Sequence, residues 1–155
     1  MKRTPLKRKS ATKRRTTSPR CERQRCNKRA EIEGLCVSHA EQRADDLMSL
    51  WVRARDHFCM ANFEHECSGR FQAAHIIGRR NQAVRYDPRN VWSLCDKAHP
   101  KVDQHTAFGI KVDWALSLLG EDGFAALRED ARVMTDRRQA IEAALGWLAP
   151  LEAVS

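Results

Sequence analysis

The stretch FQAAHIIGRRNQAVRYDPRNVWSLCDKAHPKVDQH, residues 71–105, carries the features that decide the fold. Two short apolar runs, QAAHII (72–77) and VWSL (91–94), lack a helical period and predict strands. The polar residues 78–90 predict a connection between them, and a helix is expected to begin near Asp96, which can cap it. Two strands followed by a helix predict a small α+β unit.

The same stretch places chemically active side chains on each of these elements. His75 lies in the first expected strand, Asn90 directly precedes the second, and His99 lies in the expected helix. Asp103 follows His99 at i+4, so the two side chains share one helical face. An imidazole titrates near neutrality and can take up and return a proton. The order of these residues favours a catalytic metal site over a buried structural histidine.

A cysteine-rich segment precedes this unit. Cys21, Cys26, Cys36 and His39 follow the spacing C-x4-C-x9-C-x2-H. Three thiolates and one imidazole are a common ligand set for tetrahedral structural zinc. Gly34 allows the tight turn that a metal knuckle requires. The segment holds too few apolar residues for a core of its own, so we expect zinc to stabilise it.

The remaining cysteines predict a second zinc site whose fourth ligand is open. Three thiols belong to it: Cys59, Cys67 and Cys95. His99 could complete the set, unless it binds the catalytic metal instead. His57 and His65 are the other candidates, and without one of them no zinc would bind. As single residues His57, His65 and His105 are expected at the surface.

Helical patterns flank both cysteine groups. A helix is expected over about residues 40–55, and helical periodicity returns after residue 111, with a break at 120–123 and a last helix capped by Thr135 or Asp136. The four tryptophans lie on apolar faces and are expected in the core: Trp51, Trp92, Trp114 and Trp147. The expected organisation is a tail (1–20), a zinc knuckle (21–39), a central domain with its leading helix (40–110) and C-terminal helices (111–155).

The positive charge of the chain belongs to its first residues. The net charge is +8 over 155 residues, but residues 1–20 hold nine Lys/Arg and no acid, which leaves −1 for the rest. Such a segment is expected to be disordered and to bind a polyanion, nucleic acid above all. No apolar stretch is long enough for a signal peptide or a membrane span, so we expect a cytoplasmic protein with reduced thiols. The candidate DNA contacts in the tail are Lys7, Arg8, Lys9, Lys13, Arg14 and Arg15.

The string QAAHIIGRR…DPRNVWSLCDKAHPKVD resembles the HNH endonuclease motif, whose fold is the ββα-metal unit. The likeness spans about residues 59–113 and is similar to the branch AAHI…N…LC…H, found in phage HNH proteins and in recombination nucleases of the NinG and Ref type. It implies that His75 is the general base for an attacking water and that Asn90 holds the loop and His75 in place. It also implies that His99 binds a divalent cation, Mg²⁺ or Mn²⁺, with Asp103 as second ligand or as a residue that orients His99.

Two positions depart from the family pattern. Ala74 stands directly before His75, where many HNH sites have a first metal ligand, and Ala98 stands where zinc-containing members often have the fourth zinc ligand. The AAHI branch shares the first alanine, and Mg²⁺ accepts water in its coordination shell. Arg79 and Arg80 follow His75 in the expected loop, where they could contact substrate phosphates.

Two functions fit these features. The first is a metal-dependent HNH endonuclease that hydrolyses DNA phosphodiester bonds in phage DNA processing or recombination, with structural zinc. The second is a catalytically inactive, zinc-braced nucleic-acid-binding or assembly protein on an HNH scaffold. DNA is the expected partner, a phage or host recombination or packaging protein is a further candidate, and the oligomeric state stays open.

Overall fold

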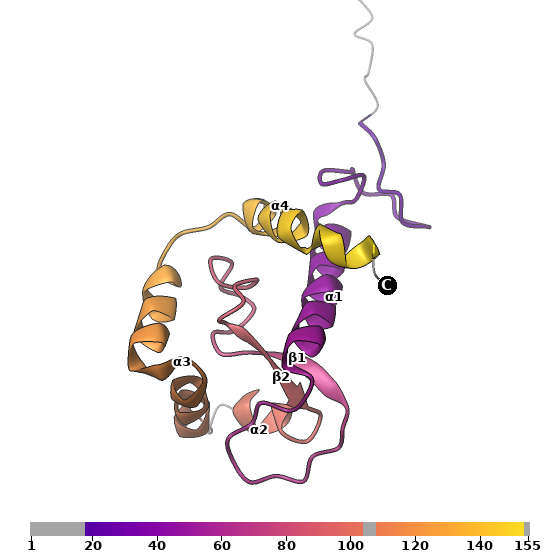
Figure 1. Cartoon of the computed structure of the whole chain (residues 1–155). Helices are drawn as coiled ribbons and strands as arrows, with labels where there is room; N and C mark the ends of the chain where they lie inside the picture. Colours follow the sequence, from indigo (N-terminus) through magenta and orange to yellow (C-terminus); the bar gives the residue numbers. More distant parts are fainter. Residues whose placement is uncertain (1–17, 104–107, 154–155) are drawn as a thin grey trace, which may run out of the picture.

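The computed structural model describes residues 18–103 and 108–153 as an α+β fold with one two-stranded antiparallel sheet (Figure 1). This confirms the expected fold class in its coarse form. The elements, in chain order, are α1 (Val37–Asp56), β1 (Phe71–His75), β2 (Val91–Cys95), α2 (His99–Asp103), α3 (Phe108–Asp130), α4 (Arg137–Leu148) and the 3-10 helix η1 (Ala149–Ala153).

The two strands form a hairpin in which Phe71 faces Cys95 and His75 faces Val91. Both strands lie where the apolar runs predicted them. The following helix begins at His99, later than the expected start near Asp96. Asp96 does not cap it, because its carboxylate pairs with Arg70 at 2.5 Å.

Both faces of the hairpin are covered by other elements. Neighbouring residues of β1 point to opposite faces, so they pack in different cores. Ala73 packs in a core formed with α1, α4 and the cysteine-rich segment, whereas Ala74 packs in a second core with α2 and α3. Figure 1 shows the hairpin between α1 and α3. The strands are therefore fixed from both sides, which a two-stranded sheet needs in order to be stable.

The C-terminal helices divide between the two cores. Trp114 of α3 is fully buried in the second core, and its indole N–H donates to the Met60 carbonyl at 2.9 Å. α3 is interrupted at Gly120, whose φ of 68° is open to glycine at little cost, as the sequence break predicted. α4 begins after Asp136, whose side chain accepts from the backbone N–H of Arg138 at 2.8 Å, and α4 packs across α1 (Figure 1).

The end of α1 is tied to β2 through an arginine and an aspartate. The guanidinium of Arg55 lies between two indole rings, 4.6 Å from the centroid of Trp51 and 4.1 Å from that of Trp92. The buried carboxylate of Asp56 accepts from the backbone N–H of Ser93 at 2.7 Å. These contacts set the position of α1 beside His75.

No helix within the described residues has the length and apolar character that crossing a bilayer requires. Residues 1–17, with all the basic side chains singled out in the tail, lie outside the described residues, and so does His105.

Candidate metal centres and catalytic site

The first cysteine cluster is assembled by a compact turn before α1. The ligand atoms of Cys21, Cys26, Cys36 and His39 lie within 4.8 Å of one another. The Cys26 and Cys36 sulfurs are 3.9 Å apart, and His39 Nδ1 lies 3.2 Å from the Cys21 sulfur. Sulfurs that share a tetrahedral zinc at about 2.3 Å are about 3.8 Å apart, so the cluster has the dimensions of such a site.

Backbone geometry explains why this segment closes on itself. Gly34 has a φ of 77°, and a Cβ there would meet the Glu22 carboxylate at 2.2 Å. The Gly34 carbonyl accepts from the Glu22 N–H at 3.0 Å. Although burial opposes it, hydrogen bonds from the Cys36 backbone and the His39 ring lower the pKa of Cys21 to about 6. One thiolate therefore forms near neutrality, as metal binding requires.

The second cluster joins the loop after α1 to the end of β2. Its members are Cys59, His65, Cys67 and Cys95. The Nδ1–H of His65 donates to the Phe63 carbonyl at 2.9 Å, which leaves Nε2 unprotonated, 3.4 Å from the Cys59 sulfur. A fixed tautomer of this kind is typical of metal-binding histidines. Burial raises the pKa of Cys95, but hydrogen bonds from the backbone N–H groups of Ser68, Ala98 and Lys97 outweigh burial and lower this pKa to about 6.

Two Cys/His groups in the described part of the chain could thus hold a metal ion, and both are compatible with structural zinc. The fourth member of the second group is His65, one of the two histidines that were candidates beside His99, and it is half-buried. His57 is not in the group: it ends α1 in a left-handed conformation (φ 60°) and is exposed. Ala98 is fully buried in the second core. The short spacing Cys59-x5-His65-x-Cys67 was the signal that could have favoured His65.

His75 stands at the end of β1 with one ring nitrogen committed to the backbone. Its side chain is buried, and its Nε2–H donates to the Arg85 carbonyl at 3.0 Å. Because a carbonyl only accepts, Nε2 carries the proton and Nδ1 keeps its lone pair. Burial and the nearby Arg79 guanidinium lower the pKa of His75 to about 4, so the ring is neutral at physiological pH. The residue lines a cavity of about 210 Å³ between α1 and β1.

Asn90 closes the loop that follows His75. Its side chain is fully buried, accepts from the Ile77 N–H at 2.7 Å, and donates to the carbonyls of Ile77 at 3.0 Å and Val84 at 2.8 Å. The Asn90 backbone carbonyl also accepts from the Ile76 N–H at 2.9 Å. These bonds hold the loop that carries the Arg85 carbonyl, and therefore fix the ring of His75.

His99 is held between two side chains at the start of α2. Its Nδ1 lies 3.0 Å from Gln72 Oε1, and its Nε2 lies 3.1 Å from Asp103 Oδ2. If Nδ1–H donates to Gln72, two lone pairs face each other at Nε2 and Oδ2, and a proton or a cation must lie between them. Burial lowers the pKa of His99. The Asp103 carboxylate raises this pKa, but the positive charges of Arg79 and Lys111 lower it further. With this tautomer the pair could hold a cation, and the Lys111 ammonium lies 3.6 Å from the other oxygen of Asp103. Sequence reasoning missed Gln72.

Ala74 is buried, whereas Arg79 and Arg80, the arginines expected to contact phosphates, are exposed. Ala74 is fully buried in the second core, so no side-chain ligand comes from it. Arg79 is exposed and lowers the pKa of both His75 and His99, so its charge acts on both halves of the site. Arg80 is exposed beside it.

Comparison of the chain with protein-family models, with curated proteins and with solved structures found no match.

Proposed function

We propose that the chain is a metal-dependent HNH endonuclease that hydrolyses DNA phosphodiester bonds. The observation that carries the proposal is His75: a buried, neutral imidazole whose Nε2–H is tied to the Arg85 carbonyl and whose Nδ1 is left with a lone pair. The His99–Asp103 pair belongs to α2, and Arg79 lowers the pKa of both His75 and His99.

In the proposed reaction Nδ1 of His75 takes a proton from water while the water oxygen attacks phosphorus. The P–O3′ bond breaks, and the leaving 3′ oxygen takes a proton from solvent, which leaves a 5′-phosphate and a 3′-hydroxyl. Asn90 keeps the Arg85 carbonyl in place, and this carbonyl fixes the tautomer of His75. Arg79 and Arg80 contact the phosphates on either side.

His99 and Asp103 would hold the divalent cation, Mg²⁺ or Mn²⁺. Gln72 would fix the His99 tautomer so that Nε2 faces the ion. When bound, this cation supplies positive charge that stabilises the phosphorane-like transition state and the leaving oxygen. Because Ala74 offers no ligand, water fills the remaining positions.

The two Cys/His clusters would hold zinc in a structural role. One brings the segment before α1 onto the first core, and the other joins the loop after α1 to β2. The proposed setting is phage DNA processing or recombination in the cytoplasm of a bacterial host, with the basic tail adding affinity for DNA.

One observation favours the alternative, a catalytically inactive nucleic-acid-binding or assembly protein on the same scaffold. Ala74 is packed in the core, so the proposed cation has only His99 and Asp103 as side-chain ligands. The two functions predict the same zinc sites and the same DNA affinity, and differ in cleavage.

Plasmid nicking with Mg²⁺ or Mn²⁺, with and without EDTA, tests the proposal. Wild-type protein should nick and EDTA should abolish nicking. His75→Asn should lower the rate by about a hundredfold or more, since general-base catalysis contributes on that order. The matched control is His57→Asn, at an exposed position outside the site whose left-handed backbone asparagine tolerates. If wild type and His75→Asn nick at one rate, the catalytic assignment is wrong.

A further inference from the structure

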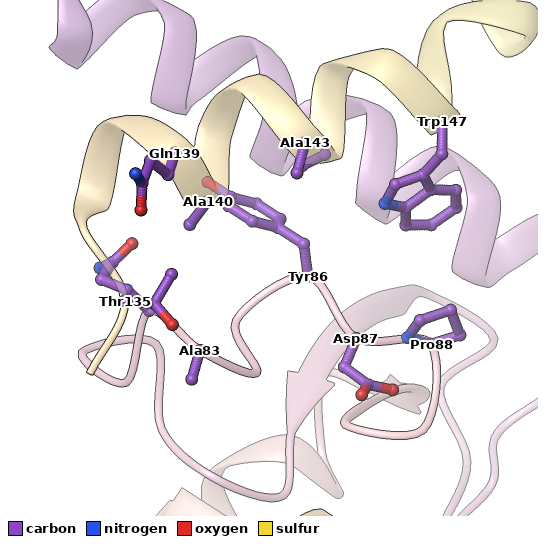
Figure 2. Close-up of a pocket in the computed structure, with 11 residues that line it drawn as sticks. Ala83, Tyr86, Asp87, Pro88, Thr135, Gln139, Ala140, Ala143 and Trp147 are labelled. Carbon is purple, nitrogen blue, oxygen red and sulfur yellow. The ribbon is translucent and has the colours of Figure 1, made fainter. Parts of the chain in front are cut away.

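Helix α4, whose sequence shows an apolar face but no chemistry, forms one wall of a pocket next to the connection between β1 and β2. The pocket has a volume of about 440 Å³, and its opposite wall is the loop of residues 82–88 (Figure 2). Figure 2 shows the Tyr86 ring extending from the loop towards α4, with Thr135 and Gln139 to one side and Trp147 to the other. The space is large enough for a nucleoside.

The lining combines flat apolar surface with amide and hydroxyl groups. Small side chains of α4, Ala140 and Ala143, keep the space open, and Trp147 stands at one end. Trp147 is 39% exposed, contrary to the expectation that it lies in the core. The Asp87 carboxylate is engaged by the Arg89 guanidinium, so the polar groups that remain are largely uncharged.

Two buried polar atoms at this pocket lack hydrogen-bond partners among the described residues. They are the amide oxygen of Gln82 and the hydroxyl of Tyr86; Tyr86 as a residue is 6% exposed, and its hydroxyl faces the Asp45 carboxylate of α1. Burial and the nearby Asp45 carboxylate raise the pKa of Tyr86, so the hydroxyl keeps its proton. A buried polar atom without a partner is costly, and such atoms often mark a place where a bound group belongs.

A line of arginines connects this pocket to His75. A hollow between the two sites is lined by four arginines, one glutamate and one glutamine: Arg79, Arg80, Arg85, Arg137, Glu41 and Gln82. Arg79 also lines the His75 cavity, and Gln82 also lines the α4 pocket. Glu41 pairs with Arg85 and Arg137, whereas Arg79 and Arg80 are exposed and make no ion pair with other described residues.

We propose that the α4 pocket takes one unpaired nucleobase of the strand whose phosphodiester lies at His75. The phosphates between them pass Arg79 and Arg80, the base lies against the aromatic surface of Trp147 and Tyr86, and the amides of Gln82 and Gln139 contact its hydrogen-bonding edge. This inference rests on the proposed function and adds to it a subsite for single-stranded nucleic acid, formed by the C-terminal helix.

The test compares binding of two probes to the full-length protein in Ca²⁺, which we use to slow cleavage. One probe is a short single strand of mixed sequence, and the other is an abasic strand of equal length and charge. Wild type should bind the base-bearing strand about tenfold more tightly, which is within the range of stacking one base on an aromatic side chain. Ala143→Phe, which fills the pocket, should remove this preference and leave the affinity for the abasic strand unchanged.

The matched control is Ala126→Phe, the same change at an exposed position of α3 away from the pocket. It should keep the full preference. If Ala143→Phe unfolds, Gln139→Ala serves instead, with the exposed helical residue Gln42→Ala as its control. If wild type binds both probes equally, or if the preference survives in Ala143→Phe, the proposal that this pocket binds a base is wrong.

Plasmid nicking by the same proteins separates the two proposals. If nicking depends on His75 but the protein binds both probes equally, the base-binding pocket is wrong and the nuclease assignment stands. A base preference that Ala143→Phe abolishes, without any nicking, keeps the pocket as a binding site and removes the catalytic assignment.

Discussion

The side chain of Asn90 hydrogen-bonds to both backbone polar groups of Ile77, accepting from its N–H at 2.7 Å and donating to its carbonyl at 3.0 Å. A third bond runs to the Val84 carbonyl at 2.8 Å. Since the amide is fully buried, no water can replace these bonds. One side chain therefore closes the loop between β1 and β2 and holds the backbone against which His75 is fixed.

Replacement of Asn90 should destabilise the fold as well as the site. Asn90→Ala leaves three backbone groups without their partner, at about 1 kcal/mol or more each, so the free energy of unfolding should fall by roughly 3 kcal/mol. Urea unfolding of both proteins in excess zinc measures this loss of unfolding free energy. The control Asn62→Ala removes one exposed bond of 3.3 Å to the Asp113 carbonyl and should cost less than about 1 kcal/mol. Equal losses in the two variants would contradict the role given to Asn90.

Zinc content should distinguish His65 from His57. Wild-type protein should bind two zinc ions per chain, one for each Cys/His group. His65→Ala removes one of four ligands from the second group and should lower zinc affinity there by about tenfold or more, so that one ion is lost to a competing chelator. His57→Ala should retain both ions. Elemental analysis after chelator treatment measures this, and identical zinc content in the two variants would argue against the second site.

The buried imidazole of His75 should make stability depend on pH. Burial and Arg79 lower its pKa from 6.5 to about 4, so in that window the unfolded chain binds more protons than the folded one. Stability from this residue is therefore fully present above pH 6.5 and is lost as the pH falls towards 4. His75→Asn removes this titration but leaves every zinc ligand in place.

Between pH 6.5 and about 5, the free energy of unfolding should fall by about 1.5 kcal/mol more in wild type than in His75→Asn. Denaturant unfolding at the two pH values gives the difference, in which metal loss common to both proteins cancels. Parallel losses in the two proteins would show that His75 is not buried as a neutral ring.

Removal of the basic tail should change how DNA binding depends on salt. Residues 1–17 hold eight of the 28 Lys/Arg residues, and each phosphate that a tail residue neutralises contributes about 0.9 to the slope of log K against log salt. A chain that begins at Ser18 keeps both Cys/His groups and should show weaker binding and a slope smaller by several units. Titrations at a series of NaCl concentrations measure the slope, and an unchanged value would exclude the tail from DNA contact.

Local patterns predicted much of the fold. The apolar runs located both strands, the i, i+3, i+4 spacing located α1 to within a turn, and Gly120 and Asp136 marked the kink and the cap. Cys21 to His39 span only nineteen residues, so the grouping of the first cluster was readable from spacing. The expected start of α2 near Asp96 was three residues too early, because the Asp96 carboxylate forms an ion pair with Arg70, which comes from the segment before β1.

The sequence by itself determined the candidate residues: a histidine in a strand, an asparagine before the next strand, a His–Asp pair on a helix, and thiols at metal-ligand spacing. Only the tertiary structure decided how they are partnered. His65 completes the second cluster because Cys95 arrives from β2, and Gln72 meets His99 because the hairpin lies beside α2. The pocket at Trp147 exists because α4 packs on α1 and faces a loop fifty residues earlier in the chain. Such contacts depend on how the buried faces of distant elements fit together, which no local pattern records.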